Sequence, residues 1–312
     1  DPLVFFENTS FKNYVDVLKK FSKNNLVLSK DEAKWLNFLT FEVLPGKRKH
    51  ELLLLDRLVK NGKISKENFI SLLRVKDLPN DVSTISSVES VLNLTFLKAQ
   101  EVKKFGDTPL LFCTDFDYFF QEEFIQLLKR VEFKQAVEDI IQAGLIKSLD
   151  YPDIFTIGQK YSRRDVAKLF NWAKDEPPLN IGGYKIDKAT NTCPIFITYH
   201  KDDEINDTIK YEDELLNETT LKWFSKNKRT LASPDVKAIL NSPISGLDLK
   251  LFIIKDDAEG GDFYYLGKLN LIPSSVEEMM RPLEKGDESI VTMQFKLDNP
   301  VSDTLYRYIT NK

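Results

Sequence analysis

Hydrophobic and polar positions repeat with two different periods along this chain, and the period changes near residue 150. In the first half, apolar side chains recur at the spacing of one buried helix face, at Phe11, Tyr14, Val15, Leu18 and Phe21. Ser29 opens the S-x-x-E pattern of a capping box, which predicts a second helix carrying Trp35, Leu36 and Leu39. The first half is therefore expected to be helical.

Further helices are predicted over residues 47–59, 69–73, 86–97 and 116–143. A turn at Asn61-Gly62 and a cap at Ser65 separate the first two of them. Two short helices around a turn resemble part of a helix-turn-helix or a winged helix, and an ordinary helical bundle is the alternative.

Strand patterns dominate the second half. A hairpin is predicted from residues 184–186 and 193–199, and another from 249–254 and 263–269 around Gly260-Gly261. Residues 289–297 read as a further strand, and residues 301–309 as either a strand or a helix. Helices are predicted over residues 163–172, 218–226 and 235–240, capped by Ser162, Asn217 and Ser233.

These elements predict an α+β protein with two domains. Residues 1–160 would form an all-helical domain. Residues 161–312 would form a β-rich domain built as a curled sheet or small barrel with flanking helices.

Composition excludes several classes of function. The 312 residues include only two cysteines and two histidines, which suit a reducing, cytosolic setting and offer no metal-ligand cluster. No phosphate-binding loop, nucleophile elbow or dinucleotide fingerprint occurs, so catalysis by this chain alone is not expected. Apolar runs such as Leu52–Leu55 are far shorter than the roughly 20 residues of a membrane span. The chain begins Asp1-Pro2 without a secretory signal, as a piece of a longer protein would.

The formal charge of −4 argues against a nucleic-acid partner only until its distribution is considered. Residues 1–160 hold 23 basic and 23 acidic side chains, and residues 161–312 hold 21 and 25. Within the second half, a basic and aromatic run carries Lys222, Trp223, Phe224, Lys226, Lys228 and Arg229. Cations neutralise phosphates and rings stack on bases, so this run is a candidate DNA surface. The alternative is an amphipathic helix with a solvated cationic face.

Other residues offer complementary chemistry. Arg163 and Arg164 stand at a predicted helix N-terminus, where an anion would be favoured. A pocket for an unstacked base needs ring faces and a carboxylate, which Tyr211, Asp213, Tyr264 and Tyr265 could supply if they share one cavity. For each ring, packing in the core is the alternative. The loop containing Gly182-Gly183 is read as a tight turn that allows close backbone approach.

Several ordered segments resemble the DUF3427 family. They are Asn180–Tyr184, Pro194–Lys201, Ile209–Glu214, Trp223–Thr230 and Asp262–Gly267. Upstream, Leu44–Arg48 and His50–Leu54 look like the helical beginning of the same region.

The resemblance implies a function and an architecture. Such regions lie at the C-terminus of bacterial proteins with a phospholipase-D-like nuclease and a helicase-type ATPase, including Type IV restriction enzymes that act in phage defence. They cut DNA containing 5-methylcytosine or 5-hydroxymethylcytosine. This chain would be the target-recognition part, with an SRA-like or PUA-like barrel and a helical half coupling it to the motor. ATP and Mg²⁺ would belong to the missing helicase domain, and no cofactor is expected here.

Residue chemistry then assigns candidate roles within that implied function. The modified-base pocket is assigned to Tyr211, Asp213, Trp223, Phe224, Tyr264 and Tyr265. The DNA phosphates are assigned to Arg163, Arg164, Lys222, Lys226, Lys228 and Arg229. Two alternatives stay open at this point: a protein-coupling or dimerisation module, and DNA binding without regard to modification.

Overall fold

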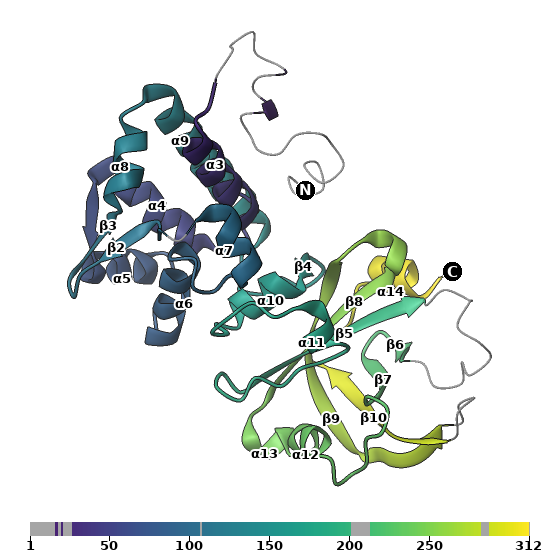
Figure 1. The fold of residues 1–312 in the computed structure, drawn as a ribbon. Helices are drawn as coiled ribbons and strands as arrows, with labels where there is room; N and C mark the ends of the chain where they lie inside the picture. Colours follow the sequence, from purple (N-terminus) through teal and green to yellow (C-terminus); the bar gives the residue numbers. More distant parts are fainter. Residues whose placement is uncertain are drawn as a thin grey trace. The chain divides into compact units, whose positions relative to one another are not determined.

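The computed structural model describes residues 16–17, 20, 27–106, 108–200, 213–281 and 287–311. The chain divides into two compact units. Unit 1 is Asp1–Ile154 with Ala173–Asp175, and unit 2 is Phe155–Trp172 with Glu176–Lys312. Helices dominate unit 1 and strands dominate unit 2 (Figure 1), which confirms the α+β class with helices first. The helix predicted around residues 11–21 lies mostly outside the described residues.

The helices of unit 1 begin largely where their capping residues predict. They are α3 (Lys30–Glu42), α4 (Lys49–Asn61), α5 (Lys66–Val75), α6 (Val82–Leu92), α7 (Ala99–Phe105), α8 (Glu122–Leu128) and α9 (Val131–Lys147). Ser29 and Glu32 form the predicted capping box of α3, and Ser65 caps α5. Gly62 ends α4 in the left-handed conformation at φ 76°, which glycine adopts without strain.

Unit 1 also contains a three-stranded sheet of β1 (Lys63–Ser65), β2 (Leu111–Cys113) and β3 (Asp117–Phe120), in the order β1-β3-β2. The prediction of one helix over residues 116–143 is therefore wrong at its start, because Tyr118 and Phe120 alternate into the core as a strand. The order α4, β1, α5, α6, β2, β3 is that of a winged helix, with α7 inserted before the β2–β3 hairpin. Of the two alternatives left open by the sequence, the structure has the winged helix.

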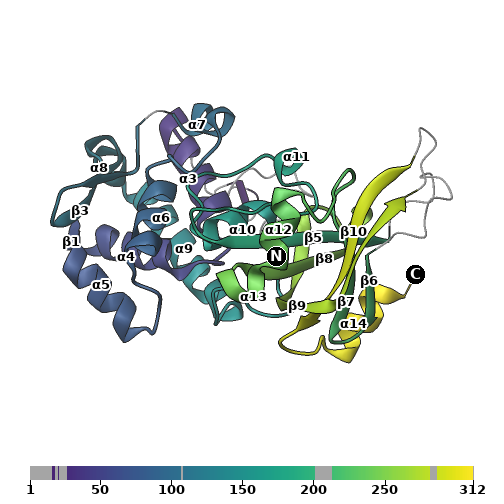
Figure 2. The same ribbon diagram turned by 90° about the horizontal axis from the view of Figure 1, so that it is seen from below.

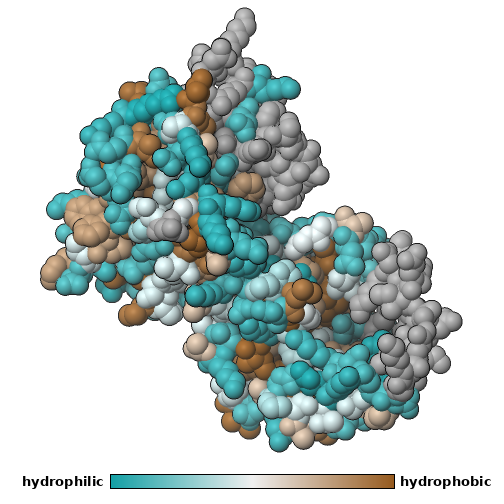
Figure 3. Space-filling model, viewed as in Figure 1, coloured by the Kyte–Doolittle hydropathy of each residue, from teal (hydrophilic) through white to brown (hydrophobic). Residues whose placement is uncertain are grey.

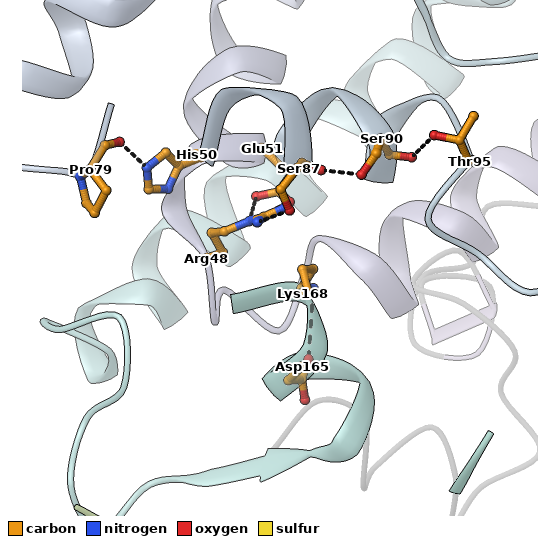
Figure 4. A network of polar contacts seen from close by, with 9 residues as sticks. All are labelled: Arg48, His50, Glu51, Pro79, Ser87, Ser90, Thr95, Asp165 and Lys168. Carbon is orange, nitrogen blue, oxygen red and sulfur yellow. Dashed lines mark hydrogen bonds and ion pairs between the residues drawn. The ribbon is translucent and has the colours of Figure 1, made fainter. Parts of the chain in front are cut away.

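A buried ion pair fixes the beginning of α4 within unit 1. Arg48 Nε donates to both carboxylate oxygens of Glu51, at 2.8 and 3.0 Å, and Arg48 Nη1 donates to Ser87 Oγ at 2.8 Å (Figure 4). His50 Nε2 lies 2.8 Å from the carbonyl oxygen of Pro79, and burial lowers the pKa of its imidazole. The contact of Arg48 with Ser87 joins the beginning of α4 to α6, so Arg48 has a structural role within unit 1.

Unit 2 is built on a seven-stranded mixed sheet (Figure 2). Its strands are β4 (Lys160–Ser162), β5 (Thr192–His200), β6 (Glu214–Asn217), β7 (Thr220–Phe224), β8 (Asp248–Asp256), β9 (Asp262–Arg281) and β10 (Glu288–Leu297). The order is β5-β8-β9-β10-β7-β6, with β4 paired to β9. Only the β5–β8 pairing is parallel among the described strands.

The long strand β9 curls the sheet. Its first part pairs with β8 and its later part with β10, and the register with β8 shifts near Gly267, at φ +123°. Such a bulge bends a strand and increases its twist. The β8–β9 hairpin and the β10 strand are confirmed as predicted.

Six helical segments complete the described part of unit 2. They are α10 (Arg163–Leu169), α11 (Pro178–Ile181), α12 (Pro234–Leu240), α13 (Ser242–Ser245), η2 (Asp257–Glu259) and α14 (Asp303–Thr310). The capping box at Ser162 and the proline at the start of α12 are as predicted. Residues 301–309, for which the sequence left a strand or a helix open, form helix α14 rather than a strand.

The helix predicted over residues 218–226 is wrong. These residues form the β6–β7 turn and strand β7, in which Leu221 and Trp223 alternate inward while Lys222 points away from the core. Asn217 caps a turn instead of a helix, since its side chain accepts a hydrogen bond from the Thr219 backbone N–H at 2.9 Å. These residues form a strand because β7 pairs with β10, which lies about 70 residues further along the chain.

Trp223 lies at the centre of the core of unit 2. Its ring is 2% exposed and packs edge-on against Tyr184 and Phe295.

Hydrophilic residues cover much of the face drawn in Figure 3, with apolar side chains in separate patches. In the described part of the chain, no helix has the length and apolar character of a membrane span.

Candidate functional site

A cavity of about 490 Å³ opens in unit 2 between the loop before β5, Lys226 shortly after β7, and helices α12 and α13. Its polar lining includes Tyr184, Lys185, Lys188, Lys226, Asp235 and Asn241. Its apolar lining includes Ile186, Ala238 and Leu247. The cavity therefore combines an apolar wall, one carboxylate and three lysines.

The carboxylate of Asp235 is oriented by two partners. Tyr184 Oη donates to Asp235 Oδ2 at 2.7 Å, and Arg229 Nε donates to the same oxygen at 2.7 Å. Partial burial raises the pKa of Asp235, but the hydrogen bonds from Arg229 and Tyr184 outweigh it and hold this pKa below its ordinary value. Asp235 therefore stays ionised at neutral pH, and its oxygens retain lone pairs for a ligand.

Lys226 connects the cavity to the glycine loop. Its Nζ donates to the carbonyl oxygens of Ile181 and Tyr184, at 3.1 and 2.8 Å, and lies 4.6 Å from the centre of the Tyr184 ring. Burial, and then the positive charge of Arg229, lower the pKa of this ammonium group. A Cβ on Gly182 would lie 3.5 Å from Lys226 Nζ and Cε, and Gly182 has φ +57°. The positive φ therefore favours glycine here, whereas a Cβ would make only an ordinary van der Waals contact with Lys226.

Short-range contacts shape the loop before β5. Isolated antiparallel bridges join Tyr184 to Ile195 and Asp187 to Thr192, so the predicted first hairpin exists as bridges rather than a full strand. Asp187 accepts hydrogen bonds from the backbone and side chain of Thr190, at 2.9 and 2.7 Å. This turn holds Lys185 and Lys188 on the cavity wall.

The predicted phosphate-binding residues do not form one group. Lys226 and Arg229 belong to the cavity and its network. The side chain of Lys228 is 75% exposed, and its Nζ forms an ion pair with Glu288 Oε1 at 3.3 Å. The backbone of Lys228 has a φ of 61°, which is unusual for a non-glycine residue. The ammonium group of Lys222 lies 5.4 Å from the Phe224 ring centre.

Arg163 and Arg164 begin helix α10, as predicted. The Arg163 guanidinium packs over the rings of Phe196 and Phe263, at 5.0 and 4.5 Å, and burial lowers its pKa. Arg164 is half-buried and makes further contacts. The structure therefore gives Arg163 a packing contact on the sheet, and its predicted role at phosphates stays a prediction.

The rings assigned to a base pocket are dispersed. Trp223, Phe224 and Tyr265 are buried, with 2%, 9% and 6% of their surface exposed. Tyr264 is half-buried, with Lys160 Nζ 4.5 Å from its ring centre. Tyr211 lies outside the described residues.

Asp213, assigned as the acceptor of that pocket, lies directly before β6. Its Oδ1 accepts a hydrogen bond from the Phe224 backbone N–H at 2.9 Å. This contact ties the strand pair β6–β7 together.

Tyr264 and the cavity lie at different positions along the sheet. Tyr264 pairs with Ile253, six residues along the chain from Leu247 in the cavity wall. At roughly 3.3 Å per residue this separation is about 20 Å. Tyr264 and Asp235 therefore do not line one pocket.

Of the cavity lining, sequence reasoning selected Lys226 and missed, among others, Tyr184, Lys185, Lys188 and Asp235. From the sequence, Tyr184 is the end of the glycine loop and the start of a predicted hairpin strand, and Asp235 is the start of a predicted helix. The one local signal was Gly182-Gly183, which marks a close approach between the loop and Lys226.

Two family models match the chain in succession. Residues 155–309 match DUF3427, a domain of unknown function. Residues 1–153 match DUF8090, also a domain of unknown function. The resemblance to DUF3427 is thus confirmed for the second half, whereas the upstream segments at Leu44–Arg48 and His50–Leu54 belong to the other match.

Comparison with other proteins adds two structures. No curated protein matches the chain. The DNA modification-dependent restriction endonuclease AspBHI is similar with a TM-score of 0.34 and 12% identity, over 49% of this chain and 45% of that one. A structure of the sulfur-binding domain and SRA domain of ScoMcrA, complexed with phosphorothioated DNA, is similar with a TM-score of 0.29 and 12% identity. That alignment covers 87% of this chain and 96% of the other. The first alignment spans less than half of AspBHI.

Proposed function

We propose that this chain is the target-recognition region of a cytoplasmic, ATP-dependent Type IV restriction enzyme of the SauUSI kind. It binds double-stranded DNA containing 5-methylcytosine or 5-hydroxymethylcytosine, and the modified base enters the cavity around Asp235. The observation that carries this proposal is the cavity itself, with its oriented carboxylate, its apolar wall and its lysines.

Each part of the cavity fits a feature of a flipped cytosine. The ionised carboxylate of Asp235 accepts a hydrogen bond from the N4 amine, which thymine does not have. Ile186, Ala238 and Leu247 supply apolar surface for a methyl group at C5. A volume of about 490 Å³ lies within the range of small-ligand sites.

The cationic side chains fit the backbone of the DNA. Lys185 and Lys188 line the cavity, and Lys188 is exposed. Lys188 would neutralise a phosphate beside the flipped nucleotide and release counterions, whereas Lys185 is paired with Glu176 at 2.6 Å. This local charge accounts for DNA binding by a chain whose formal charge is −4.

Unit 1 is proposed to couple this domain to the nuclease and helicase domains of the same polypeptide. In a DNA-reading helix-turn-helix the second helix enters the major groove. The helix at that position here is α6, Val82–Leu92, and its sequence has no lysine or arginine. A helix without cations is poorly suited to a phosphate-lined groove, which favours a protein contact for unit 1. The proposal gives this chain no catalysis of its own and assigns ATP and Mg²⁺ to the helicase domain.

A binding titration of the whole chain tests the proposal. Three otherwise identical duplexes would carry cytosine, 5-methylcytosine or 5-hydroxymethylcytosine at one position, and fluorescence anisotropy would be measured at several salt concentrations. Tighter binding to a modified duplex, with affinity falling as salt rises, is expected. Equal affinities for all three would support binding without modification specificity. Failure to bind any duplex at low salt would remove DNA recognition altogether.

A further inference from the structure

Leu179 is the most exposed large apolar side chain among the described residues, at 95%. It lies in α11, a single turn between Pro177-Pro178 and Gly182. Ile181, two residues later, is 1% exposed and packs into unit 2. The turn therefore anchors one apolar side chain in the core and holds another out in solvent.

The turn is fastened to the rim of the cavity. Ile181 presents its carbonyl oxygen to Lys226 Nζ at 3.1 Å, and the Gly182 N–H donates to the carbonyl of Pro178 at 2.9 Å. Glu176 accepts from Asn180 Nδ2 at 3.1 Å and pairs with Lys185 Nζ at 2.6 Å. Since Lys226 and Lys185 both line the cavity, α11 is fixed beside its mouth.

An apolar side chain among cations at the mouth of a base-sized cavity has a specific use on DNA. Proteins that distort a duplex insert leucine and similar side chains between base steps. The inserted side chain offsets part of the cost of unstacking, which is smallest when the base is already unpaired. Lys226 and Lys185 contact the segment that carries the wedge, so the wedge would enter the duplex beside positively charged side chains.

We infer that Leu179 is a wedge that enters the base stack beside the nucleotide drawn into the cavity. Lys226 is its positioning residue, because it clamps the carbonyl oxygens on both sides of Gly182. This inference rests on the proposed function, since it needs a base to leave the duplex.

The test compares Leu179→Ala with the wild-type chain on two duplexes. In one the modified cytosine is paired with guanine, and in the other it faces an abasic site. Loss of the wedge should weaken binding to the paired duplex about tenfold, equivalent to ~1.4 kcal/mol. Binding to the abasic duplex should change less than about twofold, because the base there is already unpaired. Leu149→Ala is the matched control, since Leu149 is 73% exposed and lies in unit 1.

A second measurement follows the stack directly. With 2-aminopurine next to the modified cytosine, wild-type binding should raise its fluorescence, and Leu179→Ala should abolish that rise at saturating protein. Leu179→Met should restore it, because methionine keeps the length and apolar character of leucine. Thermal melting should be equal for all variants, since Leu179 buries almost no surface.

The outcomes separate the wedge from the proposed function. Equal losses on the paired and abasic duplexes, or no loss on either, would overturn the wedge while leaving modified-DNA recognition intact. If the wild-type chain binds all duplexes without preference for the modified base, the proposed function fails. The ratio between paired and abasic duplexes still reports on Leu179 in that case.

Discussion

Replacing the cavity carboxylate by its neutral isostere is the sharpest perturbation of the proposed site. In Asp235→Asn the side chain keeps its shape, and Tyr184 and Arg229 can still donate to the amide oxygen. The variant loses the negative charge and half of the acceptor capacity. Discrimination between 5-methylcytosine and thymine at the flipped position should therefore fall, because only the cytosine has an N4 amine, while the fold is retained.

The expected size follows from the contacts. A hydrogen bond to a charged group contributes about 1.5–3 kcal/mol, so discrimination should fall by roughly 10- to 150-fold. The pair of Asp235 and Arg229 is partly exposed, with 24% and 35% of the side chains accessible. An exposed pair of this kind is worth about 0–1 kcal/mol, so the free energy of unfolding should change by no more than about 1 kcal/mol.

Two measurements on the same variant separate recognition from stability. Fluorescence anisotropy would give the affinity ratio between duplexes with 5-methylcytosine and with thymine at the same position, and urea unfolding would give the stability. Asp303→Asn is the matched control, because Asp303 accepts from Arg307 at 2.9 Å on the exposed helix α14. It should leave both the affinity ratio and the stability nearly unchanged.

The pH dependence follows from the lowered pKa of Asp235. The stabilisation by this carboxylate is fully present above its ordinary pKa of 3.8 and is lost as pH falls through the lower value of the folded chain. Wild-type discrimination should therefore be flat between pH 5.5 and 8. An unchanged affinity ratio in Asp235→Asn, or a loss of discrimination already at pH 6, would refute the role given to this carboxylate.

Three further predictions concern phosphate contact, capping and packing. Lys188→Gln should reduce the slope of log affinity against log salt by about 0.9 if Lys188 neutralises one phosphate, whereas the exposed Lys296→Gln should leave the slope unchanged. Asp81 caps α6, and although partial burial raises its pKa, hydrogen bonds from Ser83 and Thr84 lower it to about 2. Asp81→Ala should thus cost about 1 kcal/mol in urea unfolding at pH 7, and the difference from wild type should shrink between pH 4 and 2. Trp223→Ala should cost about 3–5 kcal/mol of stability, and a smaller loss in a melting experiment would contradict its place at the centre of the core.

The helices and hairpins with local signals could be predicted from the sequence. The capping boxes at Ser29 and Ser162 satisfy backbone N–H groups of the first turn, and the proline that starts α12 lacks the N–H that would have no partner within the helix. The Gly260-Gly261 turn likewise permits β8 and β9 to pair without a distant partner. Because these signals act over a few residues, they can be identified from a single sequence.

The basic and aromatic run was misassigned because its structure is decided at long range. Leu221 and Trp223 have the period of a strand, but the following cations and the preceding Asn217 suggested a capped helix. Strand β7 forms because β10 offers it a paired edge and a core position for Trp223. The strand ends at Phe224, so Lys226 is free to turn toward the carbonyl oxygens of the glycine loop.

The cavity could not be assembled from the sequence for a related reason. Tyr184 and Asp235 are 51 residues apart, and each alone looks like an ordinary core tyrosine or helix-start aspartate. The sequence did identify Lys226 and Arg229 as functional candidates, but as cations that would bind DNA phosphates. In the folded chain the Arg229 side chain donates to Asp235 and orients its carboxylate, and the Lys226 side chain donates to the carbonyl oxygen of Tyr184 and fixes the glycine loop. Cations used in this way shape a pocket rather than a broad basic surface, which is compatible with a formal charge of −4. Affinity concentrated in one pocket, instead of spread over phosphates, would favour a modified base over bulk DNA.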